Sequence, residues 1–201
     1  SEKKLAVLKS SLGSSAVSLS VIVADASDEV ALTTMCQSAR VIVSTVGPYA
    51  LYGEPLVKAC AENGTDYCDL CGEAYWIKAM ILKYSEAAKA SGARIVSCCG
   101  FDSIPSDLGV HFLQRQGKQR FGKYFDNIKL AVNTMKGGAS GGTLASMIEA
   151  VKAAKSDPKL RKEMNNPYIL CPENKELCHP QISIKGPVFD MDFQRWSAPF
   201  I

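Results

Sequence analysis

The chain has 201 residues, of which 47% are hydrophobic and 21% charged, which is ordinary for a globular protein with one core, or one domain and part of another. Its formal charge of +3 comes from Lys and Arg scattered among Asp and Glu, so the basic stripe that nucleic-acid binding requires is missing. No apolar run approaches the roughly 18–20 residues of a membrane span, and the first residues are too charged for a signal-peptide core. We therefore expect an intracellular protein without a transmembrane span and without a nucleic-acid partner.

Helices and strands are predicted to alternate over the first 120 residues. Apolar residues at helical spacing predict a helix over 1–12, and alternating apolar side chains predict a strand over 17–24. A short helix over 28–39 follows, with Ser27 or Asp28 as its N-cap. The other predicted elements are strands over 41–46, 65–70 and 93–99 and helices over 54–63, 74–90 and 105–116.

The strands over 41–46, 65–70 and 93–99 are each followed by a glycine-bearing loop and then by a helix. Strands that are apolar on both faces and alternate with helices are typical of a parallel sheet covered on both sides. The loops after the carboxyl ends of such strands share one edge, and ligands bind there. The sequence therefore predicts an α/β fold with a small-molecule site at that edge.

Two segments are candidates for contacting a dinucleotide. Asp25 ends a predicted strand, where dinucleotide folds contact the adenine or ribose end of the cofactor, although capping of the next helix explains it equally well. In the segment 44–49, small hydroxyl residues lead into Gly-Pro, which lets backbone approach a ligand closely, although a plain tight turn is the alternative. The members of this segment are Ser44, Thr45, Val46, Gly47, Pro48 and Tyr49.

Three acidic residues, Asp69, Glu73 and Asp102, are predicted to lie at the same edge. Carboxylates in a partly dry cleft can act as acid, base or polar anchor for a substrate, because burial shifts their pKa toward neutrality. Each of the three also fits a helix cap or a loop anchor. They are the catalytic candidates, and the sequence does not choose between these roles.

The eight cysteines predict free thiols rather than a disulfide framework. Cys98 and Cys99 are neighbours, and disulfide geometry opposes a bridge between adjacent residues. Because the sequence shows no secretory signal, we expect reduced, buried thiols in a reducing compartment.

Two groups of metal-capable side chains are too far apart to predict a metal site. Cys68 and Cys71 have C-x-x-C spacing, but Cys68 falls inside a predicted strand, and zinc needs four ligands within tetrahedral reach. The second group lies far along the chain and consists of Cys171, Cys178 and His179. We therefore expect no bound metal.

Beyond residue 117 the sequence pattern changes. Residues 126–135 alternate apolar and polar side chains, which predicts a half-solvated antiparallel strand. A helix is predicted over 143–155, with one buried face made of Leu144, Met147, Ile148 and Val151. We place a domain boundary near 118–124, which gives domains over 1–120 and 121–201.

Two long motifs carry a family resemblance. They are STVGPYALYGEPLVKACAENGTDYCDLCGE at 44–73 and GARIVSCCGFDSIPSDLG at 92–109, supported by SGGTLASMIEA, DPKLRKEMNNPYIL and RWSAPF further on. Over nearly its whole length the chain resembles the saccharopine dehydrogenase-like oxidoreductases, close to the bacterial trans-acting enoyl reductase branch.

The resemblance implies an NAD(P)-binding domain of the Rossmann type over 1–120, followed by part of an α+β domain that shapes the substrate pocket and often dimerises. It implies reduction of a C=C or C=N bond, or the reverse reaction. In the enoyl reductase branch the substrates are lipid-like, and eukaryotic members associate with membranes or lipid droplets. The nicotinamide is then expected near 44–49, and the substrate near the loops at 70–73 and 100–105.

Members of this family begin with a strand and a glycine-rich phosphate loop, which this sequence does not contain. That loop offers N–H groups to the pyrophosphate, so we expect a piece of a longer protein, cut at both ends and inactive by itself. In the Rossmann strand order the segment 17–24 would lack its neighbours. We therefore expect it to be isolated or to pair with a substitute strand.

The leading hypothesis is an NAD(P)-dependent oxidoreductase with a small-molecule, lipid-like substrate, located in the cytoplasm or peripherally on a membrane or lipid droplet. One alternative is a non-catalytic scaffold that uses the fold for protein or lipid contact. Another is a sensor that binds the nucleotide without turning it over.

Overall fold

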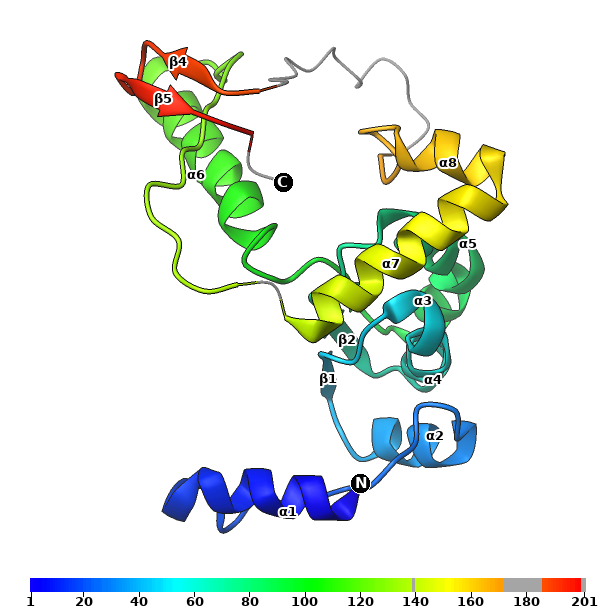
Figure 1. Cartoon of the computed structure of the whole chain (residues 1–201). Helices are drawn as coiled ribbons and strands as arrows, with labels where there is room; N and C mark the ends of the chain where they lie inside the picture. Colours follow the sequence, from blue (N-terminus) through cyan, green and yellow to red (C-terminus); the bar gives the residue numbers. More distant parts are fainter. Residues whose placement is uncertain (139, 172–185, 200–201) are drawn as a thin grey trace. The chain divides into compact units, whose positions relative to one another are not determined.

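A parallel sheet of three short strands organises the N-terminal half of the molecule (Figure 1), seen in a computed structural model that describes residues 1–138, 140–171 and 186–199. The strands pair in the order β1-β2-β3, with Val43 opposite Cys68 and Cys68 opposite Val96. They are β1 (Val41–Ser44), β2 (Asp66–Asp69) and β3 (Ile95–Val96). The three strands expected from the sequence and their parallel pairing are confirmed.

The described residues form two compact units. The first contains residues 1–101 and 140–169, and the second contains the described residues of 102–138, 170–171 and 186–199. This grouping does not follow the expected boundary near residue 120, because the helix after residue 140 packs with the sheet-bearing unit. A division of functions at residue 120 stays a prediction.

Helices cover one face of the sheet. Tyr67 of β2 is almost fully buried there, against a core that includes Val57 and Cys60 of one helix and Ile77 and Met80 of another. The helices of this layer are α2 (Glu29–Gln37), α4 (Glu54–Asn63) and α5 (Ala74–Ser91). Gly64 and Gly92 end α4 and α5 in the left-handed conformation (φ 71° and 83°), which glycine adopts without steric cost.

The opposite face of the sheet is open among the described residues. Successive strand residues point to opposite faces, so Val41 and Val43 share the face that carries Cys68 and Val96. Val41, Val43 and Val96 are each more than half exposed. These side chains are not covered within the sheet-bearing unit, so a second layer of helices on this face stays a prediction.

The segment 17–24 forms no strand, so that expectation is wrong as secondary structure. It follows α1 (Glu2–Ser11) and the 3₁₀ helix η1 (Gly13–Ala16), and its valines Val17, Val21 and Val23 are exposed. A strand is stable only with a paired neighbour, and no described strand pairs with this segment. The expected isolation of the segment is confirmed. Asp28 rather than Ser27 caps α2, since its carboxylate accepts from the N–H groups of Val30 and Ala31.

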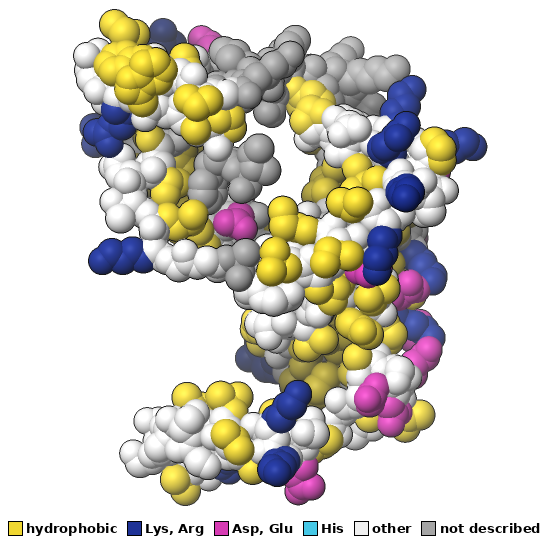
Figure 2. All heavy atoms as spheres, in the orientation of Figure 1, with side chains coloured by type: hydrophobic (Ala, Val, Ile, Leu, Met, Phe, Trp, Pro, Cys, Tyr) yellow, Lys and Arg dark blue, Asp and Glu magenta, His cyan; other side chains and the backbone are white. Residues whose placement is uncertain are grey.

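The sheet-bearing unit also contains α3 (Tyr49–Tyr52), α7 (Gly141–Ser156) and α8 (Pro158–Met164). The expected buried face of α7 is exposed, so that prediction is wrong: Leu144, Met147, Ile148 and Val151 lie at the surface, where Figure 2 shows hydrophobic side chains along the helix. The half-buried side of α7 carries small residues, including Ser146 and Ala150. Small side chains allow a close approach to α3, so they occupy the packed side of the helix.

The second unit contains α6 (Ile104–Phe121) and an antiparallel pair, β4 (Val188–Asp190) and β5 (Arg195–Ser197). The expected strand over 126–135 is absent, so that prediction is wrong. The segment contacts the hairpin through side chains instead: Lys129 pairs with Asp190 at 3.2 Å, and the Arg195 guanidinium donates to the Asn133 side chain. In the part of the chain that the structure describes, no helix is long and apolar enough to cross a membrane.

Gly53 provides a test of the packing beneath α3. A Cβ at this position would lie 2.6 and 2.9 Å from two carbons of the Trp76 ring and 2.9 Å from the carbonyl oxygen of Tyr49. Overpacking of this kind costs about 1–3 kcal/mol, so Gly53→Ala should lower the free energy of unfolding by that amount in urea titrations. Gly72→Ala is the matched control, because a Cβ at Gly72 would meet no atom within 4 Å and the change should leave stability nearly unaltered.

Candidate functional site

The carboxyl ends of the three strands meet at one edge of the sheet, as expected for the site. The residues there are the loop 45–48 after β1, the loop 70–73 after β2 and the loop 97–101 after β3. The second and third loops approach closely, since a Cβ at Gly100 would lie 3.1 Å from the Cβ of Leu70. The edge is therefore a continuous surface made by three loops of one unit.

Tyr49 joins the ends of β1 and β2. Its hydroxyl donates to the carbonyl oxygen of Ser44 at 3.0 Å and accepts from the N–H of Leu70 at 3.4 Å. Its ring is buried and lies 5.7 Å from the Trp76 ring, centroid to centroid. Burial raises the pKa of the phenol, so it stays protonated and remains a donor.

Glu73 fixes the start of α3. One carboxylate oxygen accepts from the N–H of Tyr49 at 2.9 Å and from the Ser146 hydroxyl at 2.8 Å, and the other accepts from the N–H of Ala50 at 2.9 Å. The residue is only 6% exposed. Glu73 thus links the loop after β2, the loop after β1 and α7 through three hydrogen bonds.

Asp69 joins β2 to the loop after β3. One oxygen of its carboxylate accepts from the N–H groups of Cys71 and Cys98, both at 3.0 Å. The other accepts from the hydroxyls of Tyr67 at 3.0 Å and Ser97 at 3.2 Å. Burial and the nearby carboxylate raise the pKa of the Tyr67 phenol, which keeps this donor protonated. With four donors on two oxygens, the buried carboxylate is fully satisfied.

The expected cofactor segment divides into a buried frame and an exposed tip. Ser44, Pro48 and Tyr49 are buried, whereas Thr45 and Val46 are exposed and Gly47 is half-buried. The Gly47–Pro48 peptide bond is cis. The side chains and backbone available to a ligand at the end of β1 are therefore those of residues 45–47.

The structure brings only some of the other candidates to this edge. Asp69 and Glu73 lie there together, connected through Cys71, whose N–H donates to Asp69 and whose sulfur accepts from the N–H of Glu73. Asp102 belongs to the other unit and is exposed. Asp25 is exposed and forms a local turn in which its carboxylate accepts from the N–H and hydroxyl of Ser27, and these bonds lower its pKa. The catalytic and cofactor roles stay predictions.

Several residues of this network carry no signal in the sequence. Tyr67 and Ser97 donate to Asp69 and are 2 and 28 residues away from it in the sequence. Ser146 donates to Glu73 and is 73 residues away from it. The short-range contact of Asp69 with the N–H of Cys71 is the exception, because an aspartate that bonds the backbone two residues on is a common turn pattern. The long-range partners depend on the pairing of β2 with β3 and on the packing of α7.

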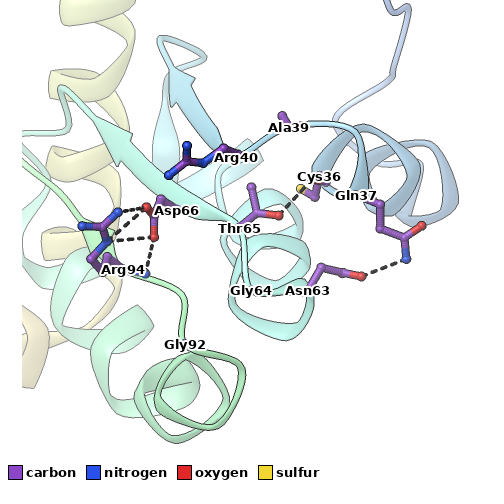
Figure 3. A pocket seen from close by; sticks show the side chains of 10 residues that line it. All are labelled: Cys36, Gln37, Ala39, Arg40, Asn63, Gly64, Thr65, Asp66, Gly92 and Arg94. Carbon is purple, nitrogen blue, oxygen red and sulfur yellow. Dashed lines mark hydrogen bonds and ion pairs between the residues drawn. The ribbon is translucent and has the colours of Figure 1, made fainter.

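A polar pocket of about 420 Å³ lies at the opposite, amino-terminal edge of the sheet (Figure 3). Its charges are largely matched within the protein: the Arg94 guanidinium pairs with the Asp66 carboxylate and lowers the pKa of that group. The Gln37 amide donates to Asn63, and the Thr65 hydroxyl donates to the carbonyl oxygen of Cys36. Because ligands of parallel α/β sheets bind at the carboxyl edge, this pocket is the weaker candidate.

No disulfide joins the described cysteines Cys36, Cys60, Cys68, Cys71, Cys99 and Cys171. Within that part of the chain, no group of three or more His, Cys, Asp and Glu side chains is arranged to hold a metal ion. Cys178 and His179, from the second metal-capable group of the sequence, lie outside the described residues.

Comparison with known proteins relates the chain to one family of NADP-binding proteins. Residues 1–96 match the saccharopine dehydrogenase NADP binding domain. Three mycobacterial relatives carry the name trans-acting enoyl reductase, the first of them as a putative one. The M. tuberculosis protein is 39% identical over 212 residues, covering 100% of this chain and 49% of the relative. The Mycobacterium ulcerans protein is 40% identical, over 97% of this chain and 46% of its own length. The Mycobacterium bovis protein is 42% identical, over 85% of this chain and 41% of its own length.

This chain spans about half the length of the curated relatives it matches. No solved structure matches it.

Asp69→Asn tests the structural role of the buried carboxylate. The amide nitrogen of the new side chain cannot accept a hydrogen bond, so the two donors that face this position would lose their acceptor. Leaving buried donors without the charged acceptor costs about 3 kcal/mol. We expect a loss of that size in the free energy of unfolding, measured by urea titration. Asp102→Asn is the matched control, because Asp102 is exposed, and it should leave the unfolding midpoint unchanged. Equal losses in the two variants would contradict this assignment.

Proposed function

Because this chain belongs to the saccharopine dehydrogenase-like oxidoreductases, we propose that the full protein is an NAD(P)-dependent oxidoreductase that reduces a C=C or C=N bond. The observation that carries the proposal is the carboxyl edge of the sheet. There the exposed residues Thr45 and Val46 and the half-buried Gly47 are held by a buried frame that includes Tyr49 and Glu73. Dinucleotide folds use this edge of the sheet for the cofactor.

The residues of this edge fit the nicotinamide end of the cofactor. Thr45 offers a hydroxyl, Val46 an apolar surface, and Gly47 a backbone without a side chain, all next to one another at the end of β1. A bound NAD(P)H supplies the hydride. The contribution of this chain is to orient the ring and the acceptor, since hydride transfer depends on their relative placement.

We assign different roles to the three acidic candidates within this proposal. The carboxylates of Asp69 and Glu73 are buried and accept four and three hydrogen bonds, which suits positioning groups that hold the loops. Asp102 is exposed, so among the three it is the one whose carboxylate a substrate can reach, as a polar anchor.

The names of the relatives and the surface of α7 favour an enoyl group carried on an apolar substrate. The relatives are named as enoyl reductases, which reduce C=C bonds. The packed side of α7 reaches the site through Ser146 and Glu73, and its outer side exposes Leu144, Met147, Ile148 and Val151. This apolar surface also favours a peripheral location on a membrane or lipid droplet over a purely cytoplasmic one.

A nucleotide sensor without catalysis, or a scaffold, is the alternative. A sensor would bind NADPH and release it unchanged, and a scaffold would not bind it. The exposed apolar side of α7 is the feature that favours a scaffold, because it offers a contact surface for a protein or lipid.

Val46→Asp tests the proposed nicotinamide contact. The new carboxylate would stand at the exposed tip of the 45–47 loop, where it would repel the cofactor phosphates and break the apolar contact. We expect the Kd for NADPH, measured on the full protein by nicotinamide fluorescence, to rise about tenfold or more, which corresponds to about 1.4 kcal/mol. Val30→Asp makes the same change at an exposed valine on α2 and should leave the Kd unaltered.

The outcomes separate the hypotheses. Absence of NADPH binding by the unmodified full protein would contradict both the enzyme and the sensor and leave the scaffold. Binding without NADPH oxidation across a panel of enoyl and imine substrates would support the sensor. An unchanged Kd in Val46→Asp would remove the 45–47 loop from the proposed site.

Met147→Glu tests the apolar substrate. The side chain is 61% exposed, so the variant should unfold at the same urea concentration as the unmodified protein. If the outer side of α7 contacts an acyl chain, kcat/KM for long-chain enoyl substrates should fall about tenfold relative to short-chain ones. A uniform effect on both substrate lengths would contradict the contact.

A further inference from the structure

Two cysteines, one on β2 and one in the loop after β3, lie on neighbouring segments at the carboxyl edge of the sheet. Cys68 is on β2, and its register partner on β3 is Val96. The backbone N–H of Cys99 donates to the carbonyl oxygen of Asp69 at 2.6 Å, so the backbone of Cys99 lies against the residue that follows Cys68.

The Cys99 side chain turns back toward Cys68. Its sulfur lies 3.5 Å from the carbonyl oxygen of Val96, the residue paired with Cys68. The backbone allows this return because Cys98 has a positive φ of 60°, which bends the chain directly after β3. Burial raises the pKa of the Cys99 thiol, and the charges that the nearby Cys68 and Asp69 side chains can carry add to that rise.

Both thiols are accessible from the open face of the sheet. Cys68 and Cys99 are half-buried, and the neighbouring side chains on this face, Val43 and Val96, are exposed. A disulfide reagent can reach half-buried thiols in such positions, and the two cysteines belong to segments whose backbones are hydrogen-bonded to each other.

We propose that Cys68 and Cys99 form a redox modification site, at which a small-molecule disulfide converts the two thiols into a reversible bridge between β2 and the loop after β3. The proposal does not rest on the proposed cofactor or substrate. The bridge would tie the loop 97–101 to β2 covalently, at the place where the backbone of Cys99 already bonds to Asp69.

The chemistry is a pair of thiol–disulfide exchanges with oxidised glutathione as the oxidant. The thiolate of one cysteine attacks the reagent, forms a mixed disulfide and releases one reduced glutathione. The thiolate of the other cysteine then attacks the sulfur of the first, forms the Cys68–Cys99 bond and releases the second glutathione. The protein loses two hydrogen atoms and two electrons, the reagent gains them, and dithiothreitol reverses the reaction.

Another thiol pair serves as an internal comparison. The sulfurs of Cys36 and Cys60 lie 3.5 Å apart, but both side chains are fully buried between α2 and α4, and burial raises the pKa of both. Although these two thiols are close together, a disulfide reagent cannot reach them, so we expect no thiol–disulfide exchange at this pair in the folded protein. Cys71 is likewise buried, at 2% exposure.

Peptide mapping of the full protein tests the proposal. The folded, reduced protein is incubated with oxidised glutathione, its free thiols are blocked in denaturant, and it is digested with trypsin. The Cys68–Cys99 bridge would link peptide 59–78 to peptide 95–115, whereas a Cys36–Cys60 bridge would link 59–78 to 10–40. We expect the first link, its loss after dithiothreitol, and no second link.

Serine variants locate the bridge within the linked peptides, because each peptide holds more than one cysteine. Cys68→Ser and Cys99→Ser should each abolish the link, and the matched controls Cys71→Ser and Cys98→Ser should retain it. Fragmentation of the linked pair from the unmodified protein identifies the bridged residues even if a variant fails to fold. Mixed disulfides alone, a link through Cys71 or Cys98, or no oxidation would overturn the proposal.

Discussion

The hydrogen bonds of the buried Asp69 carboxylate hold the carboxyl edge of the sheet together. Burying a charge without partners is costly, and here four donors from β2, the loop after β2 and the loop after β3 offset that cost. Cys71, one of these donors, continues the network to Glu73, which fixes α3 and reaches Ser146 on α7. Each loop of the edge is thus placed by a carboxylate rather than by apolar packing alone.

Sequence patterns predicted the elements whose signals are local. The repeated pattern of a short strand, a glycine-bearing loop and a helix predicted β1, β2 and β3, and the glycines at 64 and 92 predicted the ends of α4 and α5. The segment 17–24 has an equally clear alternation and forms no strand. Strand pairing depends on residues far apart in the sequence. The alternation of apolar and polar side chains therefore indicates which residues suit a strand, but it does not indicate whether a partner strand is present.

The faces of elements were harder to predict than the elements themselves. Helical periodicity correctly indicated that α7 is amphipathic, but the large apolar residues lie outside and small ones such as Ser146 face the packed side. The same holds for the acidic candidates: residue type and position placed Asp69 and Glu73 at the edge. Their partners Ser97 and Ser146 depend on tertiary contacts that no spacing encodes.

A loop fixed in this way is suited to a ligand that must be held in one orientation. The tip at 45–47 leaves its own groups exposed while its anchors, Ser44 and Tyr49, are immobilised by hydrogen bonds on both sides. Binding to a preformed loop avoids the entropy of ordering it, so the contact energy goes into affinity and orientation. The buried carboxylates therefore contribute to function by holding the loop in place. Removing one of their hydrogen-bond donors would make residues 45–47 more mobile without changing a group that a ligand touches.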